Sequence, residues 1–237
     1  MRRLMRLVGK NSVLKDDIHD KKVFIGVGHG GSDPGATSAG LFEKNINLVT
    51  ALACKSELER HGVLVGMSRT TDEDDPIAQE VKECNAFKPD LAIDCHVNAG
   101  GGDGFEIFYW EGSKSGKRLS QCIESEVKSI GQNSRGLKSG KHLRFVNGTD
   151  CTAVLAESFF IDNSLDRKIA DTNAEQQKFG KAYAKGILKY LGIEYKESTS
   201  KPTKLYRVQV GAFGSKSNAD RLAKELVAKG YPAYVSE

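Results

Sequence analysis

Val23-Phe-Ile-Gly-Val27 runs directly into Gly28-His-Gly-Gly31, and this junction of an apolar run with a glycine-rich loop decides the fold. A short apolar run of this kind predicts a buried strand. Further along the chain, β-rich runs at 63–67, 91–97, 104–110 and 152–158 alternate with helical patterns at 43–61, 76–87, 116–131 and 166–191. This alternation predicts an α/β fold, a three-layer domain with a mostly parallel sheet flanked by helices.

The composition excludes several classes of protein. The chain has 237 residues, enough for one sizeable core and a small second module, and its net charge of +4 is too mild to indicate a nucleic-acid partner. No apolar run reaches the roughly 18 residues that a membrane span needs, so none is expected. The five cysteines are odd in number and form no C-x-x-C pair, which favours reduced, mostly buried thiols over a disulfide framework or a zinc ribbon.

The two ends of the chain differ from the middle. Residues 1–22 and residues 201–237 each hold 7 basic and 3 acidic side chains. Residues 1–21 form a basic extension that lacks the apolar centre of a signal peptide, because Arg6 and Lys10 interrupt it. We therefore expect the chain to be made in the cytoplasm without a signal peptide and to act only after release.

A polar segment at 194–204, which contains a proline, predicts a linker after a first domain at 22–193. Beyond it, the pattern predicts a strand at 205–213, a helix at 217–229 and a strand at 231–235, a small C-terminal βαβ piece within 205–237. A piece of this length buries little apolar surface by itself. We therefore expect it to be half of a larger module or to rely on a partner.

The stretch Gly26-Val-Gly-His-Gly-Gly31 satisfies G-x-G-x-x-G, the dinucleotide-binding pattern, but its context does not fit. In a dinucleotide-binding fold the third glycine opens a helix, whereas here Ser32-Asp-Pro-Gly35 predicts a turn. The acidic ribose ligand expected about 20 residues later would fall inside a helical pattern. A nucleotide site is therefore the least favoured reading.

Four side chains instead suggest a metal centre. His29 follows the first strand, His96 lies near the end of the strand at 91–97, and Glu43 begins the first helix. Two imidazoles and one carboxylate are a ligand set for one catalytic zinc ion per chain, with a position left open for water. A fourth side chain, Glu157, emerges from an apolar strand and can move the proton of that water.

Other polar residues receive weaker expectations. Side chains alternate along a strand, so Asp94, His96 and Asn98 should share one face, which makes Asn98 a candidate substrate contact. His142 lies in a polar loop that could line the same cleft, as a second candidate. Glu106 alternates with apolar neighbours and is expected to be solvated or structural.

Six stretches, in this order along residues 22–192, resemble the zinc-dependent N-acetylmuramoyl-L-alanine amidases of the amidase 3 type, found in bacterial autolysins and phage endolysins. They are Gly28-His-Gly-Gly31 with Asp33-Pro-Gly35, Phe42-Glu-Lys-Asn-Ile-Asn-Leu48, Ser68-Arg-Thr-Thr-Asp72, Asp94-Cys-His-Val-Asn-Ala99, Gly104-Phe-Glu-Ile-Phe-Tyr109 and Val154-Leu-Ala-Glu-Ser-Phe-Phe-Ile-Asp-Asn163. The resemblance implies that His29, Glu43 and His96 bind zinc and that Glu157 is the catalytic base.

The implied reaction is hydrolysis of the amide between N-acetylmuramic acid and L-alanine in bacterial peptidoglycan, after the enzyme is released by a holin or by mother-cell lysis.

Two stretches depart from the family pattern. Asp94-Cys95 replaces the usual small or apolar residues before the histidine, and residues 79–85 lack the arginine commonly seen before the asparagine. Two alternatives stay open: a zinc peptidase acting on the stem peptide, and a non-catalytic wall-binding protein.

Tyr206-Arg-Val-Gln-Val-Gly-Ala-Phe213 and Ala219-Asp-Arg-Leu-Ala-Lys-Glu-Leu226 resemble one half of a SPOR repeat, a peptidoglycan-binding module. A whole module needs two βαβ halves. The C-terminal piece is therefore expected to be a partial wall-binding module, and a homodimer that pairs two halves is one way to complete it.

Overall fold

The computed structural model describes residues 21–197, 210–228 and 235. The chain divides into two compact units, with the boundary between Lys196 and Glu197. The first unit carries the sheet and every candidate site residue. Within its described residues, the second carries one helix.

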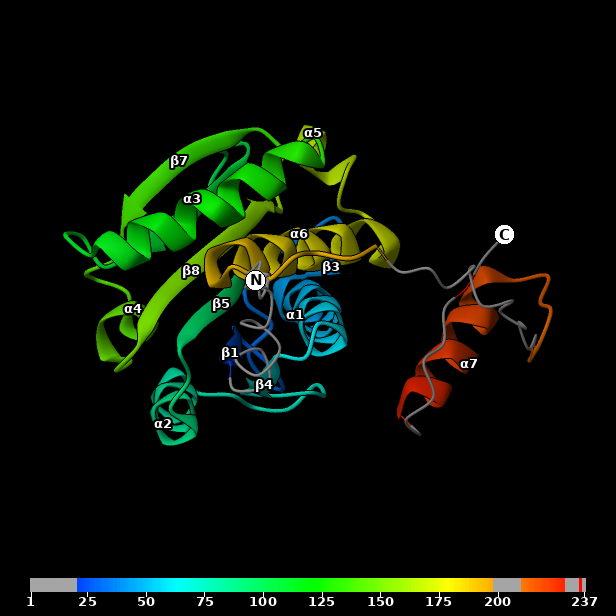
Figure 1. Cartoon of the computed structure of the whole chain (residues 1–237). Helices are drawn as coiled ribbons and strands as arrows, with labels where there is room; N and C mark the ends of the chain where they lie inside the picture. The colour runs from blue at the N-terminus through cyan, green and yellow to red at the C-terminus, as the bar shows by residue number, and fades with distance from the viewer. Residues whose placement is uncertain (1–20, 198–209, 229–234, 236–237) are drawn as a thin grey trace, which may run out of the picture. The chain divides into compact units, whose positions relative to one another are not determined.

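A six-stranded sheet, in the order β4-β1-β5-β8-β6-β7, forms the centre of the first unit (Figure 1). The strands β1, β4, β5 and β8 are parallel, β6 runs antiparallel to β8, and β7 is parallel to β6. A small antiparallel pair, β2 and β3, stands apart from this sheet. The bounds are β1 Lys22–Val27, β2 Thr37–Ser38, β3 Leu41–Phe42, β4 Leu64–Met67, β5 Leu91–Asn98, β6 Phe105–Tyr109, β7 Ser134–Ser139 and β8 Thr152–Phe160.

Helices cover both faces of the sheet, which confirms the predicted three-layer α/β fold. On one face lie α1 (Glu43–Arg60), α3 (Lys114–Ser129) and α6 (Asn173–Leu191), packed side by side (Figure 1). On the other face lie α2 (Ile77–Phe87) and α4 (Arg144–Gly148), which contact each other. The short helix α5 (Ser164–Arg167) follows β8.

Alternation along β1 shows how the two apolar layers form. Val23, Ile25 and Val27 belong to the large cluster under α1 and α6, whereas Phe24 belongs to a smaller cluster with residues of α2 and α4. A strand buried on both faces needs apolar residues at consecutive positions, and this explains the continuous apolar run in the sequence.

Several elements differ from the sequence prediction, which did not include the short pair β2 and β3. The helix expected at 166–191 is two helices, because Thr172 and Glu175 form a capping box that starts α6 anew. The strand β7 was missed because Ser-Arg-Gly-Leu-Lys-Ser is polar and has no apolar alternation, as an edge strand allows. The short helix α4 was missed as well.

The first unit extends into the predicted linker. The ring of Tyr195 stacks on His61 with ring centroids 4.9 Å apart, and the backbone N–H of Lys196 donates to His61 Nε2 at 2.9 Å. Tyr195 also donates to a carboxylate oxygen of Glu57, 3.3 Å away. These contacts pack residues 195 and 196 against the end of α1, beyond the expected boundary at 193.

The second unit contains α7 (Lys216–Ala228), close to the helix predicted at 217–229. Most of the two strands predicted around it, 205–209 and 231–234, lies outside the described residues, and residues 210–213 are not in a strand. The βαβ arrangement therefore stays a prediction.

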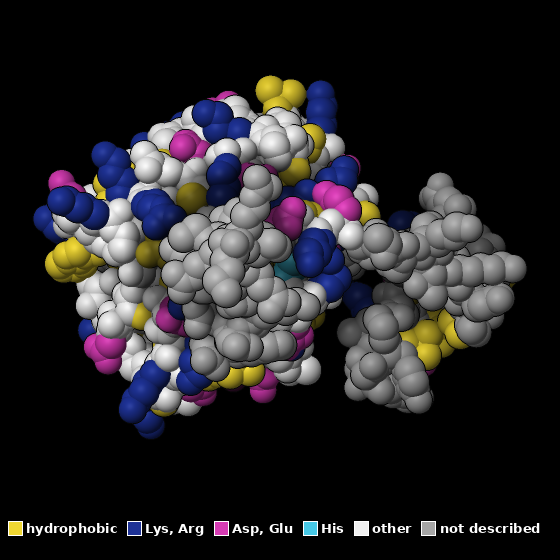
Figure 2. All heavy atoms as spheres, viewed as in Figure 1, with side chains coloured by type: hydrophobic (Ala, Val, Ile, Leu, Met, Phe, Trp, Pro, Cys, Tyr) yellow, Lys and Arg dark blue, Asp and Glu magenta, His cyan; other side chains and the backbone are white. Residues whose placement is uncertain are grey.

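The charged side chains at the surface and the cysteines can also be located in the structure. Lys and Arg side chains are interspersed with Asp and Glu over the visible face of the first unit (Figure 2). All five cysteines are free, and Cys54, Cys84 and Cys95 are buried. Among the described residues, no helix is long and apolar enough to cross a membrane.

Candidate metal centre

His29, Glu43 and His96 come together where β1 and β5 end and α1 begins. Each of the three offers a ligand atom, and these atoms lie within 4.8 Å of one another. In parallel sheets, loops at the carboxyl ends of the strands collect functional residues. The spacing in sequence, 14 and then 53 residues, is bridged because β1 and β5 are neighbours in the sheet.

The loop that carries His29 is held in an unusual shape. His29 itself has φ of 63°, in the left-handed region that favours glycine. Its backbone surroundings are fixed by Arg69, which is 2% exposed and donates to the carbonyl oxygens of Val27 and Lys44, at 3.0 and 2.8 Å. A buried guanidinium thereby fixes a loop that hydrophobic packing alone would leave free.

Gly28 lets the second histidine approach this loop. A Cβ placed on Gly28 would lie 2.1 Å from both Cε1 and Nε2 of His96. Only glycine leaves room for the ring, so the glycine here is required by the close approach of the two segments.

Glu43 lies between the two imidazoles. Its Oε2 is 3.3 Å from His29 Nε2, and its Oε1 is 3.0 Å from His96 Nδ1. The backbone N–H groups of Ala36 and Val97 also donate to this carboxylate. Burial would raise the pKa of Glu43, but the hydrogen bonds from both histidines outweigh burial and hold the pKa well below its usual range. Glu43 is therefore ionised.

The nitrogen of each histidine that faces away from Glu43 meets another carboxylate. His29 Nδ1 is 2.8 Å from Asp33 Oδ2, and His96 Nε2 is 3.2 Å from Asp94 Oδ2. The hydrogen bond with Glu43 raises the pKa of His29. Burial opposes a charge on His96, yet Asp94 and Glu43 raise the pKa of its ring well above the ordinary value. This acid-rich surrounding favours a cation at the centre.

Glu157 is the neighbour of His96 in the sheet, because β5 and β8 pair these two residues in register. Its Oε2 is buried and has no hydrogen-bond partner among the described residues. Burial, reinforced by the charges of Glu43 and Asp94, raises the pKa of Glu157 to about 7. A carboxyl group with such a pKa can both accept and release a proton near neutral pH.

Asn98 and Glu106 extend the polar face beyond Glu157. Glu106 pairs with Glu157 across the antiparallel strands β6 and β8. Its Oε2 accepts a hydrogen bond from Asn98 Nδ2 at 3.0 Å, and its Oε1 accepts one from Arg135 Nε at 2.6 Å. Glu106, 7% exposed, is thus a structural residue that borders the site, one of the two roles expected from the sequence.

His142 is not brought into the cluster. It is exposed, in the segment between β7 and α4, and its ring meets that of Phe108 edge-on at 6.1 Å between centroids. Its role in substrate binding stays a prediction.

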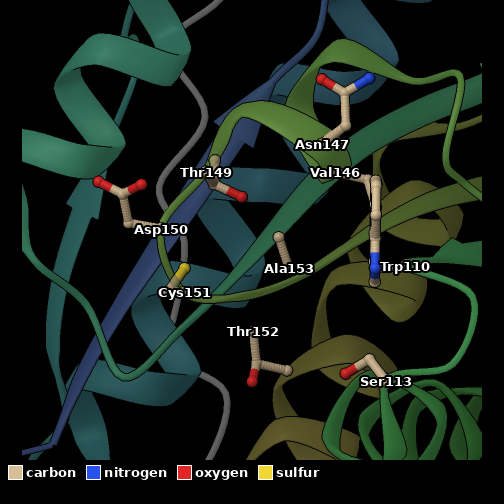
Figure 3. Close-up of a pocket in the computed structure, with 9 residues that line it drawn as sticks. All are labelled: Trp110, Ser113, Val146, Asn147, Thr149, Asp150, Cys151, Thr152 and Ala153. Atoms are coloured by element: carbon tan, nitrogen blue, oxygen red, sulfur yellow. The ribbon is translucent and has the colours of Figure 1, made fainter.

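A shallow pocket of about 430 Å³ lies elsewhere, at the start of β8 and the end of β6 (Figure 3). Because β5 and β8 are parallel, the start of β8 lies at the opposite edge of the sheet from the carboxyl ends. None of the candidate site residues lines this pocket, whose lining includes Trp110, Ser113, Asn147 and Cys151.

Sequence reasoning overlooked several residues that support the cluster. Asp33 and Arg69 lie inside quoted motifs, but the patterns gave no sign that they hold His29. Asp74 accepts hydrogen bonds from the backbone N–H and the hydroxyl of Ser32 and so braces the same loop. Asp33 is only four residues from His29, but Arg69 and Asp74 contact residues 42 positions away in the sequence, which no local pattern encodes.

Two imidazole nitrogens and a carboxylate oxygen that face one another form the donor set of a zinc site. Histidines that ligate zinc usually direct their second nitrogen to a carboxylate or carbonyl, as His29 and His96 do here. The residues therefore fit a metal ion, and Glu157 lies on the strand next to one of them, His96.

Comparison with known proteins gives consistent matches. Residues 23–189 match the family model described as N-acetylmuramoyl-L-alanine amidase, and residues 181–237 match the SPOR domain. The N-acetylmuramoyl-L-alanine amidase CwlM of Bacillus licheniformis is 35% identical over 218 residues, which are 90% of this chain and 84% of that protein. The sporulation-specific N-acetylmuramoyl-L-alanine amidase of Bacillus subtilis has the same identity and coverage.

A solved structure agrees as well. The catalytic domain of CwlV, an N-acetylmuramoyl-L-alanine amidase from Bacillus (Paenibacillus) polymyxa, superposes with a TM-score of 0.68 at 26% identity. The superposition covers 73% of this chain and 99% of that structure.

Proposed function

Because this chain belongs to the N-acetylmuramoyl-L-alanine amidase family, we propose that it cleaves peptidoglycan with one zinc ion held by His29, Glu43 and His96. The reaction is hydrolysis of the amide that joins N-acetylmuramic acid to L-alanine. We further propose Glu157 as the base of this reaction. The observation that supports this assignment best is the convergence of two imidazoles and one buried carboxylate next to Glu157, whose Oε2 is buried and has no hydrogen-bond partner among the described residues.

His29, Glu43 and His96 would hold the zinc ion, which would supply a Lewis acid for the scissile carbonyl and lower the pKa of a bound water molecule. Glu157 accepts the proton of the attacking water and delivers it to the nitrogen of L-alanine as the amide breaks. Its pKa of about 7 suits both steps, because the group must be ionised first and protonated afterwards. Asp33 holds the imidazole of His29 in orientation while this occurs.

Asn98 is proposed as a substrate contact. It lies two residues after His96 on β5, at the point where the pairing with β8 shifts register. Its side chain is fixed by Glu106, which in turn is held by Arg135. A half-buried amide fixed in this way can orient a peptide group without losing much side-chain entropy.

The product distinguishes this function from its main rival, a zinc peptidase that cuts the stem peptide. Digestion of purified peptidoglycan followed by mass spectrometry should show free glycan strands and stem peptides that begin with a new amino terminus on L-alanine. New termini within the stem, with L-alanine still attached to the glycan, would identify a peptidase. Intact walls after treatment with zinc-loaded protein would favour the non-catalytic alternative.

The C-terminal unit is proposed as the wall-binding part of the enzyme. Support comes from the SPOR match over residues 181–237 and from the α7 helix, which coincides with the helix of the predicted βαβ half. The homodimer suggested by the half-module has no support in the described residues and is not part of the proposal.

A further inference from the structure

Two buried carboxyl groups lie behind His96, on the side away from Glu43. Asp94 on β5 is 0% exposed, and Glu80 on α2 is 2% exposed. These residues belong to the two stretches in which the sequence departs from the family pattern. The departures in sequence therefore meet at one place in the fold.

Asp94 contacts His96, one of the proposed metal ligands, through one carboxylate oxygen. Its Oδ2 lies 3.2 Å from His96 Nε2, while its Oδ1 is buried without a hydrogen bond of standard geometry. The other ring nitrogen, Nδ1, points toward Glu43. A neutral imidazole has one N–H and one lone pair, so the partner of one nitrogen decides which nitrogen can bind a metal.

Glu80 is the neighbour of Asp94. Both carboxyl groups lie against Gly26, where a Cβ would come within 2.2 Å of Glu80 Oε1 and 2.8 Å of Asp94 Oδ1. Burial and the nearby charges of Asp94 and Asp75 raise the pKa of Glu80 well above its ordinary value. Ser68 Oγ donates weakly to Glu80 Oε1, at 3.4 Å. A protonated Glu80 has one O–H to donate, and the Asp94 oxygen without a partner among the described residues lies against the same glycine.

We propose that Asp94 is a positioning residue that accepts the Nε2 hydrogen of His96 and so leaves Nδ1 free for the metal, with Glu80 donating a hydrogen bond to Asp94. This inference rests on the proposed metal site. Asp94 stands where the family pattern places a small or apolar residue before the histidine, and it keeps a carboxylate buried beside the ligand. Outer carboxylates of this kind fix the ring and raise its basicity.

The first test measures zinc affinity by competition with a chromophoric chelator in the folded full-length chain. Asp94→Asn and Asp94→Ala should each bind zinc about 10- to 100-fold more weakly than the wild type. Asp166→Asn is the matched control, because Asp166 is equally a buried aspartate but accepts from the backbone N–H groups of Gly104 and Phe160. This control should lose stability and keep its zinc affinity.

Substitutions at Glu80 test the second half of the inference. Glu80→Gln retains a donor for Asp94 and should keep zinc affinity within about twofold of the wild type. Glu80→Leu removes the donor at similar size and should weaken zinc binding about 10-fold. Equal affinities for the Gln and Leu variants would show that Glu80 does not act as a donor.

The tautomer of His96 can be read in the wild type, whatever the variants do. Long-range proton–nitrogen spectra of the zinc-loaded, nitrogen-labelled protein should show a hydrogen on Nε2 of His96 and none on Nδ1. A hydrogen on Nδ1, or wild-type affinity in folded Asp94 variants, would overturn the inference while leaving zinc binding and amidase activity intact. A wild-type chain that binds no zinc would instead contradict the proposed function itself.

Discussion

His96 and Glu157 are direct partners in the sheet, paired in register by the parallel strands β5 and β8. Their side chains therefore leave the sheet on the same face. The His96 ring lies beside Glu43, and Oε2 of Glu157 has no hydrogen-bond partner in the part of the chain that the structure describes. The pairing of the two strands therefore fixes the separation between the proposed metal ligand and the proposed base. Proton transfer at one reacting centre requires such a fixed separation.

Glu157→Gln should retain zinc and lose catalysis. The amide has nearly the same shape as the carboxyl group but cannot take a proton from water, so the rate of wall hydrolysis should fall by a factor of about 10² to 10⁴. Release of L-alanine amino termini from purified walls measures the rate, and atomic emission measures the metal. Activity within a factor of a few of the wild type would remove Glu157 from the mechanism.

The same residue should make the metal-free protein less stable as the pH rises. Burial raises the pKa of Glu157 from 4.5 to about 7, so between these values the unfolded chain has released a proton that the folded protein still holds. The free energy of unfolding therefore loses a contribution from this group across that range. Below pH 4.5 the contribution is fully present, and above pH 7 the loss is complete.

Urea unfolding in the presence of a chelator measures this effect. The stability of Glu157→Gln relative to the wild type should increase from pH 4.5 to pH 7 and stay level above that. A difference that is constant across this range would show that Glu157 ionises in the folded protein as it does in solution.

Gly28→Ala should disturb the metal centre, because the added methyl group would lie 2.1 Å from the His96 ring. The ring has to move, so zinc affinity should fall at least 10-fold. Gly40→Ala is the matched control: Gly40 has φ of 80° and no atom within 4 Å of the added Cβ, so it carries only backbone strain of about 1–2 kcal/mol. Both variants are compared by chelator competition after circular dichroism has verified folding. Unchanged zinc affinity in Gly28→Ala would contradict the close approach of the two segments.

Sequence patterns could single out candidate site residues, because a polar side chain stands out in a regular pattern. His29 lies within a glycine-rich loop, and Glu157 follows the apolar run at 153–156. Alternation along β5 also placed Asp94 and His96 on one face, as the structure has them, with Cys95 in the core on the other. The residues that share one face of a strand can be predicted from the sequence because side chains alternate between the two faces.

The strand order and the supporting contacts could not be predicted in the same way. Nothing local indicates that β8 follows β5 in the sheet while β6 and β7 lie beyond it. Arg69 had no visible role, because its partners are carbonyl oxygens of other segments. The break before α6 could have been found, since Thr172 and Glu175 have the spacing of a capping box.

Two truncations should separate wall binding from folding. A chain that ends after Lys196 retains the contacts of Tyr195 with His61 and Glu57, so it should fold normally, hydrolyse soluble fragments at the wild-type rate and pellet less with purified walls. A chain that ends after Gly192 lacks these contacts and should melt a few degrees lower. Equal pelleting of the Lys196 truncation and the full chain would show that the C-terminal unit does not target walls.

The account depends most on where the metal binds, and anomalous scattering at the zinc edge tests this directly in a crystal of the zinc-loaded protein. We predict one strong peak per chain, about 2.0–2.2 Å from a nitrogen of His29, a nitrogen of His96 and an oxygen of Glu43. A peak bound by other residues, or none near these three side chains, would contradict the central claim.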